Sequence, residues 1–120
     1  MTSGPRLARV SEEFREILAE EIPKLKDPRV GFVTVTGVDV SPDLRHAVVL
    51  YTVMGEESER KATRAGLRSA RAYLRTVIGH QVRMKFIPEL EFREDEGVEQ
   101  ARRVDEVLRE IHEEPDGPPG

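Results

Sequence analysis

Residues 32–54 read FVTVTGVDVSPDLRHAVVLYTVM, and this stretch decides the fold. From Phe32 to Val40 it is rich in valine and threonine, the β-branched residues that suit a pleated strand. Gly37 interrupts the alternation and predicts a β-bulge. Ser41-Pro42-Asp43 predicts a turn, and the apolar run from Ala47 to Met54 is typical of a central strand buried on both faces. The short connection therefore predicts an antiparallel hairpin.

Apolar residues at helical spacing predict helices on both sides of this hairpin. Upstream, an amphipathic pattern begins at Arg6, and Pro23 should end or kink that helix near Ile22 because proline lacks the amide hydrogen. Downstream, residues 55–58 open a longer helix, for which Gly79 is a suitable C-cap. A last amphipathic helix is marked by Val98, Ala101, Val104, Leu108 and Ile111.

Residues 82–87 predict a third strand, because apolar and basic side chains alternate there. After Pro88, Leu90 and Phe92 continue an extended segment. A right-handed crossover through the long helix would lay the third strand parallel to the second. The prediction is an α+β fold with a three-stranded sheet and helices packed on one of its faces.

The length of 120 residues fits one domain. We expect a disordered N-terminus at 1–5, a folded domain at 6–112 and a disordered tail at 113–120, which is acidic and rich in proline and glycine. The absence of cysteine excludes disulfides, thiolate metal ligands and a cysteine nucleophile. Neither a signal-peptide pattern nor an apolar stretch of membrane-spanning length is present, so we expect a cytoplasmic protein with no membrane partner.

The net charge of −4 hides a segregation of charge along the chain. Residues 60–85 contain eight basic residues and no acid, whereas residues 86–120 contain four basic and twelve acidic residues. On a straight helix turning about 100° per residue, five arginines fall within a stripe roughly 80° wide, with Lys61 at its edge. This arginine stripe consists of Arg60, Arg64, Arg68, Arg71 and Arg75.

Two kinds of partner could balance the arginine stripe. Like charges on one helix face repel each other, and a solvated helix usually interleaves acids with bases. The arginine side chain is a planar fork that binds phosphate through two hydrogen bonds and also stacks on bases, so nucleic acid is the favoured partner. The alternative is that the stripe pairs with the acidic C-terminal helix of the same chain.

No arrangement of residues in the sequence points to catalysis or to a bound cofactor. His46, His80 and His112 are scattered, and none has a second ligand at metal-binding spacing. No serine has a histidine placed nearby in the chain as a base. The acids at 94–99 lack the alternation of a calcium-binding loop and are better explained as the N-terminal acids of a helix. We therefore expect no cofactor, no metal and no enzymatic activity.

Several stretches together resemble the ribosome-binding factor A family. The resemblance covers about residues 6–111, nearly the whole predicted domain, and it is specific because the stretches are ordered and long in combination. They are Asp27-Pro28-Arg29, the run from Val33 to Leu44, Tyr73-Leu74-Arg75 with Ile78-Gly79, and Pro88-Glu89-Leu90-Glu91-Phe92.

The resemblance implies a KH-like domain of type II topology, with the element order α-β-β-α(kink)α-β-α. Members of this family look like a helix–kink–helix with an Ala-x-Gly kink. The matching positions are Ala70, Arg71 and Ala72, of which Ala72 departs from the family glycine. The resemblance further implies a non-catalytic factor that binds the immature small (30S) ribosomal subunit, assists maturation and processing of 16S rRNA and supports growth in the cold. We expect a monomer.

The charge pattern, rather than the resemblance, selects the residues expected to contact rRNA. Binding would depend on phosphate contacts that release counterions. A protein–protein adaptor that docks the arginine stripe on an acidic partner is the alternative function. The candidate RNA-binding residues are Arg60, Lys61, Arg64, Arg68, Arg71, Arg75, Arg83 and Lys85.

Overall fold

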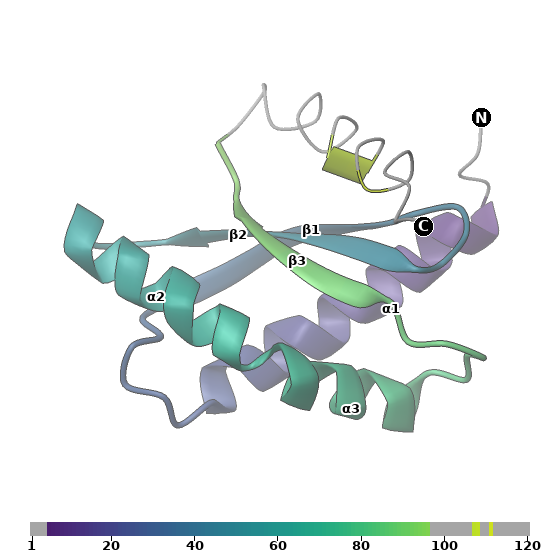
Figure 1. Cartoon of the computed structure of the whole chain (residues 1–120), viewed down its shortest axis with the longest axis horizontal. Coiled ribbons are helices and arrows are strands. Elements are labelled where there is room, and N and C mark those ends of the chain that lie inside the picture. The colour runs from purple at the N-terminus through teal and green to yellow at the C-terminus, as the bar shows by residue number, and fades with distance from the viewer. Residues whose placement is uncertain (1–4, 97–106, 109–110, 112–120) are drawn as a thin grey trace.

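The structure, a computed structural model, describes residues 5–96, 107–108 and 111. The predicted α+β class is confirmed (Figure 1). Most of the predicted last helix and all of the two expected disordered segments except Pro5 lie outside the described residues. Within residues 5–96 the elements are α1 (Pro5–Glu21), the 3-10 helix η1 (Ile22–Lys24), β1 (Val33–Val40), β2 (His46–Val53), α2 (Glu57–Ser69), α3 (Arg71–Gln81) and β3 (Glu89–Glu94).

The strands β1 and β2 form the predicted antiparallel hairpin. Val33 pairs with Val53 at its open end. The register shifts between Val35 and Gly37, so the β-bulge predicted here is confirmed. β2 lies in the centre of the sheet, and β3 pairs with it in the predicted parallel direction. The order helix, strand, strand, two helices, strand agrees with the order that the family resemblance implies.

The three helices cover one face of the sheet (Figure 1). Each contributes fully buried side chains: Phe14 and Leu18 from α1, Leu67 from α2, and Leu74 and Ile78 from α3. Removing these apolar groups from water is the main stabilising contribution to the fold. Their buried partners on the strands are Val35, Val38, Val40, Ala47, Val49, Tyr51 and Leu90.

The prediction of a strand at residues 82–87 is wrong, because β3 begins only at Glu89. On a strand the side chains of Val82, Met84 and Phe86 would share one face. Instead, Val82 and Met84 pack against the core while Phe86 is 58% exposed. The alternation therefore comes from a loop that touches the core at intervals, and the extended segment after it supplies the strand.

The long helix expected after residue 55 is two helices that meet at Ala70. This residue caps the end of α2 and the start of α3, and its ψ angle is 0°, outside the usual helical range. It is the first of the three positions at which the resemblance implies a kink, and the break forms although Ala72 replaces the family glycine. The prediction of Gly79 as the C-cap is wrong, because α3 continues to Gln81.

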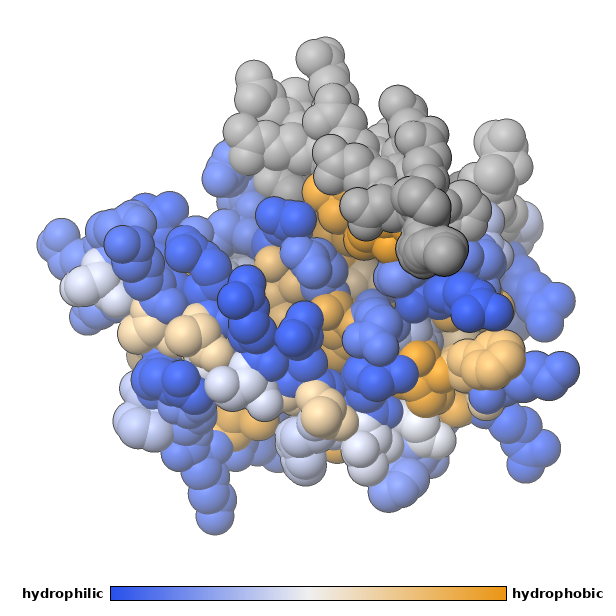
Figure 2. Space-filling view, in the orientation of Figure 1, coloured by the Kyte–Doolittle hydropathy of each residue, from blue (hydrophilic) through white to orange (hydrophobic). Residues whose placement is uncertain are grey.

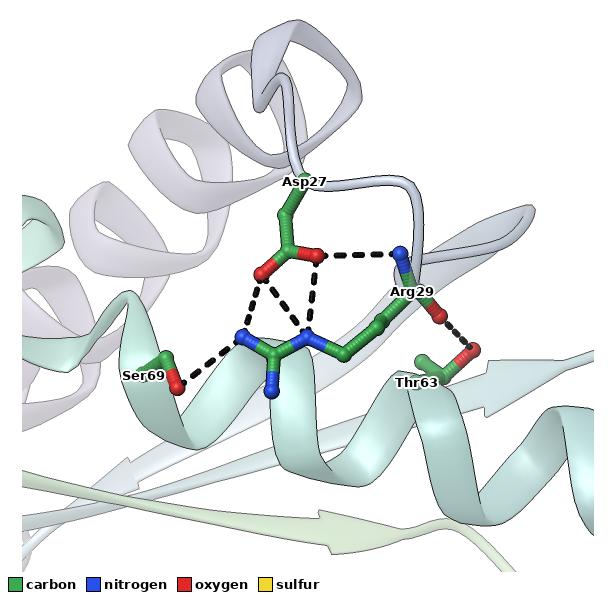
Figure 3. A network of polar contacts seen from close by, with 4 residues as sticks. All are labelled: Asp27, Arg29, Thr63 and Ser69. Carbon is green, nitrogen blue, oxygen red and sulfur yellow. Dashed lines mark hydrogen bonds and ion pairs between the residues drawn. The ribbon is translucent and has the colours of Figure 1, made fainter.

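The turn before β1 is anchored on α2 (Figure 3). The Asp27 carboxylate accepts hydrogen bonds from the Arg29 amide at 2.9 Å and from its guanidinium at 2.6 Å. The same guanidinium donates to Ser69 Oγ at 3.1 Å. The Thr63 hydroxyl accepts from the Gly31 amide at 3.1 Å and donates to the Arg29 carbonyl at 3.3 Å. One side of α2 is therefore occupied by this turn.

Close approach of the turn requires a glycine on α2. A Cβ atom at Gly66 would lie 2.6 Å from Val30 Cγ2, closer than side chains normally come. The hydrogen bonds from Arg29 also lower the pKa of Asp27 from 3.8 to about 2, because they stabilise the carboxylate. The contact at Gly66 packs the turn against α2, and the lowered pKa reflects the hydrogen bonds within the turn.

Candidate nucleic-acid interface

The helix α2 carries the first three arginines of the stripe, and local capping determines where it begins. The Glu59 carboxylate accepts a hydrogen bond from the Glu56 amide at 2.6 Å, in a capping box that closes the first turn. The side chains of Thr63 and Leu67 are buried: Thr63 faces the turn before β1, and Leu67 faces the core. The arginines fall on the remaining side, which faces β3.

A groove lies between α2 and β3, and three arginines of the stripe line it: Arg64, Arg68 and Arg71. Tyr51, Phe92 and Val107 form its apolar part, and the rings of Tyr51 and Phe92 meet edge to face at 71° with 6.4 Å between centroids. Arg93 and the acids Glu91, Glu94 and Glu96 also line it. Figure 2 shows this face, with hydrophilic side chains over α2 and apolar groups between α2 and β3. Burial raises the pKa of the Tyr51 hydroxyl, so it stays protonated near neutral pH.

One acid from β3 partly neutralises the start of the stripe. The Glu94 carboxylate accepts a hydrogen bond of 2.9 Å from Arg60 Nε and lies 3.7 Å from Arg64 Nη2. This hydrogen bond raises the pKa of Arg60 further above its usual value. Residues 60–85 of the sequence contain no acid, but the sheet brings Glu94 to Arg60 from 34 residues away, and Glu57 lies 3.9 Å from Arg60 Nη1.

The middle of the stripe is less neutralised. Arg71 Nε donates to the Arg68 carbonyl at 3.3 Å, across the break between the helices. Lys61 and Arg68 are exposed and form no ion pair with another residue in the described part of the chain.

Arg75, the last residue of the stripe, has a structural partner. Its guanidinium donates to the carbonyl oxygens of Ile87 at 2.7 Å and Pro88 at 3.0 Å, and lies 3.7 Å from Glu89. The side chain therefore holds the loop that leads into β3. Arg75 does not line the groove, although it shares α3 with Arg71, which does.

Arg83 and Lys85 lie in the loop between α3 and β3, apart from the groove residues. Both are exposed, and so is the neighbouring Phe86. The guanidinium of Arg45, from the hairpin turn, lies 5.5 Å from the centre of the Phe86 ring, a cation–π contact. Sequence reasoning missed Arg45 and Phe86, although a lone arginine between acidic residues and an aromatic residue in a basic loop were visible signals.

Among the described residues, no three histidine, aspartate or glutamate side chains are grouped so that they could hold a metal ion. None of the helices formed by these residues is both long enough and apolar enough to cross a membrane.

Comparisons with known proteins agree on one family. A family model described as ribosome-binding factor A matches residues 6–108. A similar relative is the ribosome-binding factor A of Geobacter sulfurreducens, 46% identical over 110 residues, which are 91% of this chain and 93% of that protein.

Solved structures lead to the same family. The crystal structure of ribosome-binding factor A from Thermus thermophilus matches with a TM-score of 0.67 and 32% identity, over 73% of this chain and 93% of that one. A homology model of the Thermus thermophilus protein, fitted into the cryo-electron microscopy map of its complex with the 30S subunit, matches with a TM-score of 0.62. It is 32% identical and covers 72% of this chain and 92% of that one.

Proposed function

Because this chain belongs to the ribosome-binding factor A family, we propose that it binds the small (30S) ribosomal subunit and assists maturation and processing of its 16S rRNA. The proposal is directed to particular residues by the groove beside β3, which Arg64 and Arg68 line from α2 and Arg71 lines from the start of α3. The family does not favour the alternative of a protein–protein adaptor.

The mechanism is binding energy alone, without a catalysed step. Arginine and lysine side chains replace counterions on rRNA phosphates, which releases those ions and drives association. A protein that binds one rRNA conformation more tightly than another shifts the population toward it. This role places the protein in the cytoplasm, where the subunit is assembled, and the support of growth in the cold stays a prediction.

The test is co-sedimentation with small ribosomal subunits across a salt series. The informative variant combines Lys61→Gln with Arg68→Gln, because these exposed side chains form no ion pair with another described residue and can be changed without disturbing the fold. Arg75 is left intact because it holds the loop before β3. Loss of two phosphate contacts should lower the slope of log affinity against log salt by about 1.4, at about 0.7 per contact with single strands.

A matched control removes the same charge elsewhere. Arg6→Gln with Arg9→Gln changes two exposed residues at the start of α1, which lies across the molecule from the start of α2 (Figure 1). This variant should keep the wild-type slope. If wild type sediments with a salt-dependent affinity and the two variants have equal slopes, the contact surface lies away from α2. Wild type that does not sediment with the subunit contradicts the proposed function itself.

A further inference from the structure

We propose that Phe86 is a stacking platform for an unpaired RNA base, with cations around it that contact the neighbouring phosphates. The inference rests on the proposed function and adds a second contact surface to it. That surface, called the Phe86 platform below, consists of Phe86 and Lys85 with Arg83 from the α3–β3 loop and Arg45 from the hairpin turn.

The ring is held outside the core by residues on both sides of it. Met84 and Ile87 pack against the core, whereas Phe86 keeps 58% of its surface exposed. Arg75 fixes the end of the loop through the carbonyls of Ile87 and Pro88. An exposed aromatic ring on an anchored loop loses little conformational entropy when it binds a ligand.

The arginine beside the ring is also held in place. Its turn is closed by Asp43, which accepts hydrogen bonds from Ser41 Oγ at 2.6 Å and from the Arg45 amide at 3.0 Å. The Arg45 carbonyl in turn accepts from the Glu89 amide at 2.9 Å, which ties the turn to the start of β3. Two segments far apart in the chain are thus joined where Arg45 meets Phe86.

The charge around the ring favours RNA. The side chains of Arg45, Arg83 and Lys85 are exposed, and none forms an ion pair with another residue in the part of the chain that the structure describes. The nearby carboxylate of Asp43 already contacts the turn, and that of Glu89 already contacts Arg75. An exposed aromatic ring with unpaired cations is the composition that binds single-stranded RNA, because every base offers a face for stacking.

Fluorescence of a single tryptophan tests the contact directly. The chain contains no tryptophan, so Phe86→Trp introduces the only one. Stacking of a base on the indole should quench its emission when a single-stranded oligoadenylate of about eight nucleotides is added, but not with a duplex of the same length. The matched control is Phe32→Trp, since Phe32 is 88% exposed next to the opposite end of the hairpin. Absent quenching at position 86, or equal quenching at both positions, overturns the proposal.

Sedimentation with small subunits separates this proposal from the proposed function. Phe86→Leu should weaken binding about fivefold to 150-fold at every salt concentration, with an unchanged salt slope, while Phe86→Tyr retains wild-type binding. Wild-type binding by Phe86→Leu overturns the platform alone. Weakened binding by Phe86→Leu without quenching of Phe86→Trp also overturns it, since the ring would then contact a protein. Wild type that does not sediment overturns both proposals.

Discussion

Arg60 Nε donates a hydrogen bond of 2.9 Å to Glu94 Oε2, and this contact joins the start of α2 to the end of β3. Only 16% of the Glu94 side chain is exposed, compared with 40% of that of Arg60. The acid therefore lies under the arginine, at the rim of the groove. It lowers the positive charge of the α2 surface that we propose to bind rRNA, which leads to the first prediction.

Glu94→Gln should steepen the salt dependence of binding to the small subunit. Glutamine keeps the shape of the side chain but removes the carboxylate beside Arg64, whereas Arg60 keeps Glu57 at 3.9 Å, so Arg64 becomes able to contact a phosphate. One added contact would raise the slope by about 0.7. The control is Glu12→Gln, which removes the partner of Arg15 on α1 and should leave the slope unchanged. Weaker binding by Glu94→Gln would mean instead that Glu94 orients the arginines.

Gly66→Ala should destabilise the protein, whereas Gly79→Ala should stabilise it. Both glycines are helical, and alanine in a helix is favoured over glycine by about 1 kcal/mol. At Gly66 the new methyl group would lie 2.6 Å from Val30, and overpacking of this kind costs about 1–3 kcal/mol. At Gly79 the nearest atom, on Ile87, is 3.4 Å away, a tolerable contact. Urea denaturation measures the free energy of unfolding of each variant. Equal values for the two variants would contradict the packing argument.

Thr63→Val should lower the free energy of unfolding by about 1–3 kcal/mol. The side chain is 1% exposed, and its hydroxyl is bonded to the Gly31 amide and the Arg29 carbonyl. Valine has the same shape but leaves both groups without this partner. Thr52→Val, on the exposed side of β2, should change stability by less than about 0.5 kcal/mol. A small effect at Thr63 would show that water replaces the hydroxyl.

Asp27→Asn should reduce stability near neutral pH by an amount that shrinks in acid. The pKa of Asp27 is lowered from 3.8 to about 2 in the folded protein by Arg29. A lowered pKa stabilises the fold fully above the unfolded value of 3.8, and this contribution disappears as the pH falls through about 2. Urea midpoints of wild type and variant should therefore converge between about pH 4 and pH 2. A carboxyl titration of Asp27 followed by NMR with a midpoint near 3.8 would contradict the assignment.

The fold depended mostly on local patterns, which explains why much of it was predictable. Alternating β-branched residues, a glycine at the bulge and a short polar turn are enough to specify the β1–β2 hairpin. The helical spacing of apolar residues likewise predicted α1. The third strand was misplaced because an alternating pattern records which side chains touch the core, and a loop such as 82–87 can produce it as well as a strand.

Only part of the candidate site could be predicted from the sequence. The sequence by itself determined the density of positive charge between residues 60 and 85 and the family to which the chain is similar. Only the tertiary structure decided which of these charges have a partner: β3 brings Glu94 to Arg60, the loop before β3 accepts hydrogen bonds from Arg75, and the hairpin turn places Arg45 on Phe86. The physical reason is that electrostatic and stacking interactions depend on distance in space, and a sheet with crossover connections brings together residues that are far apart along the chain.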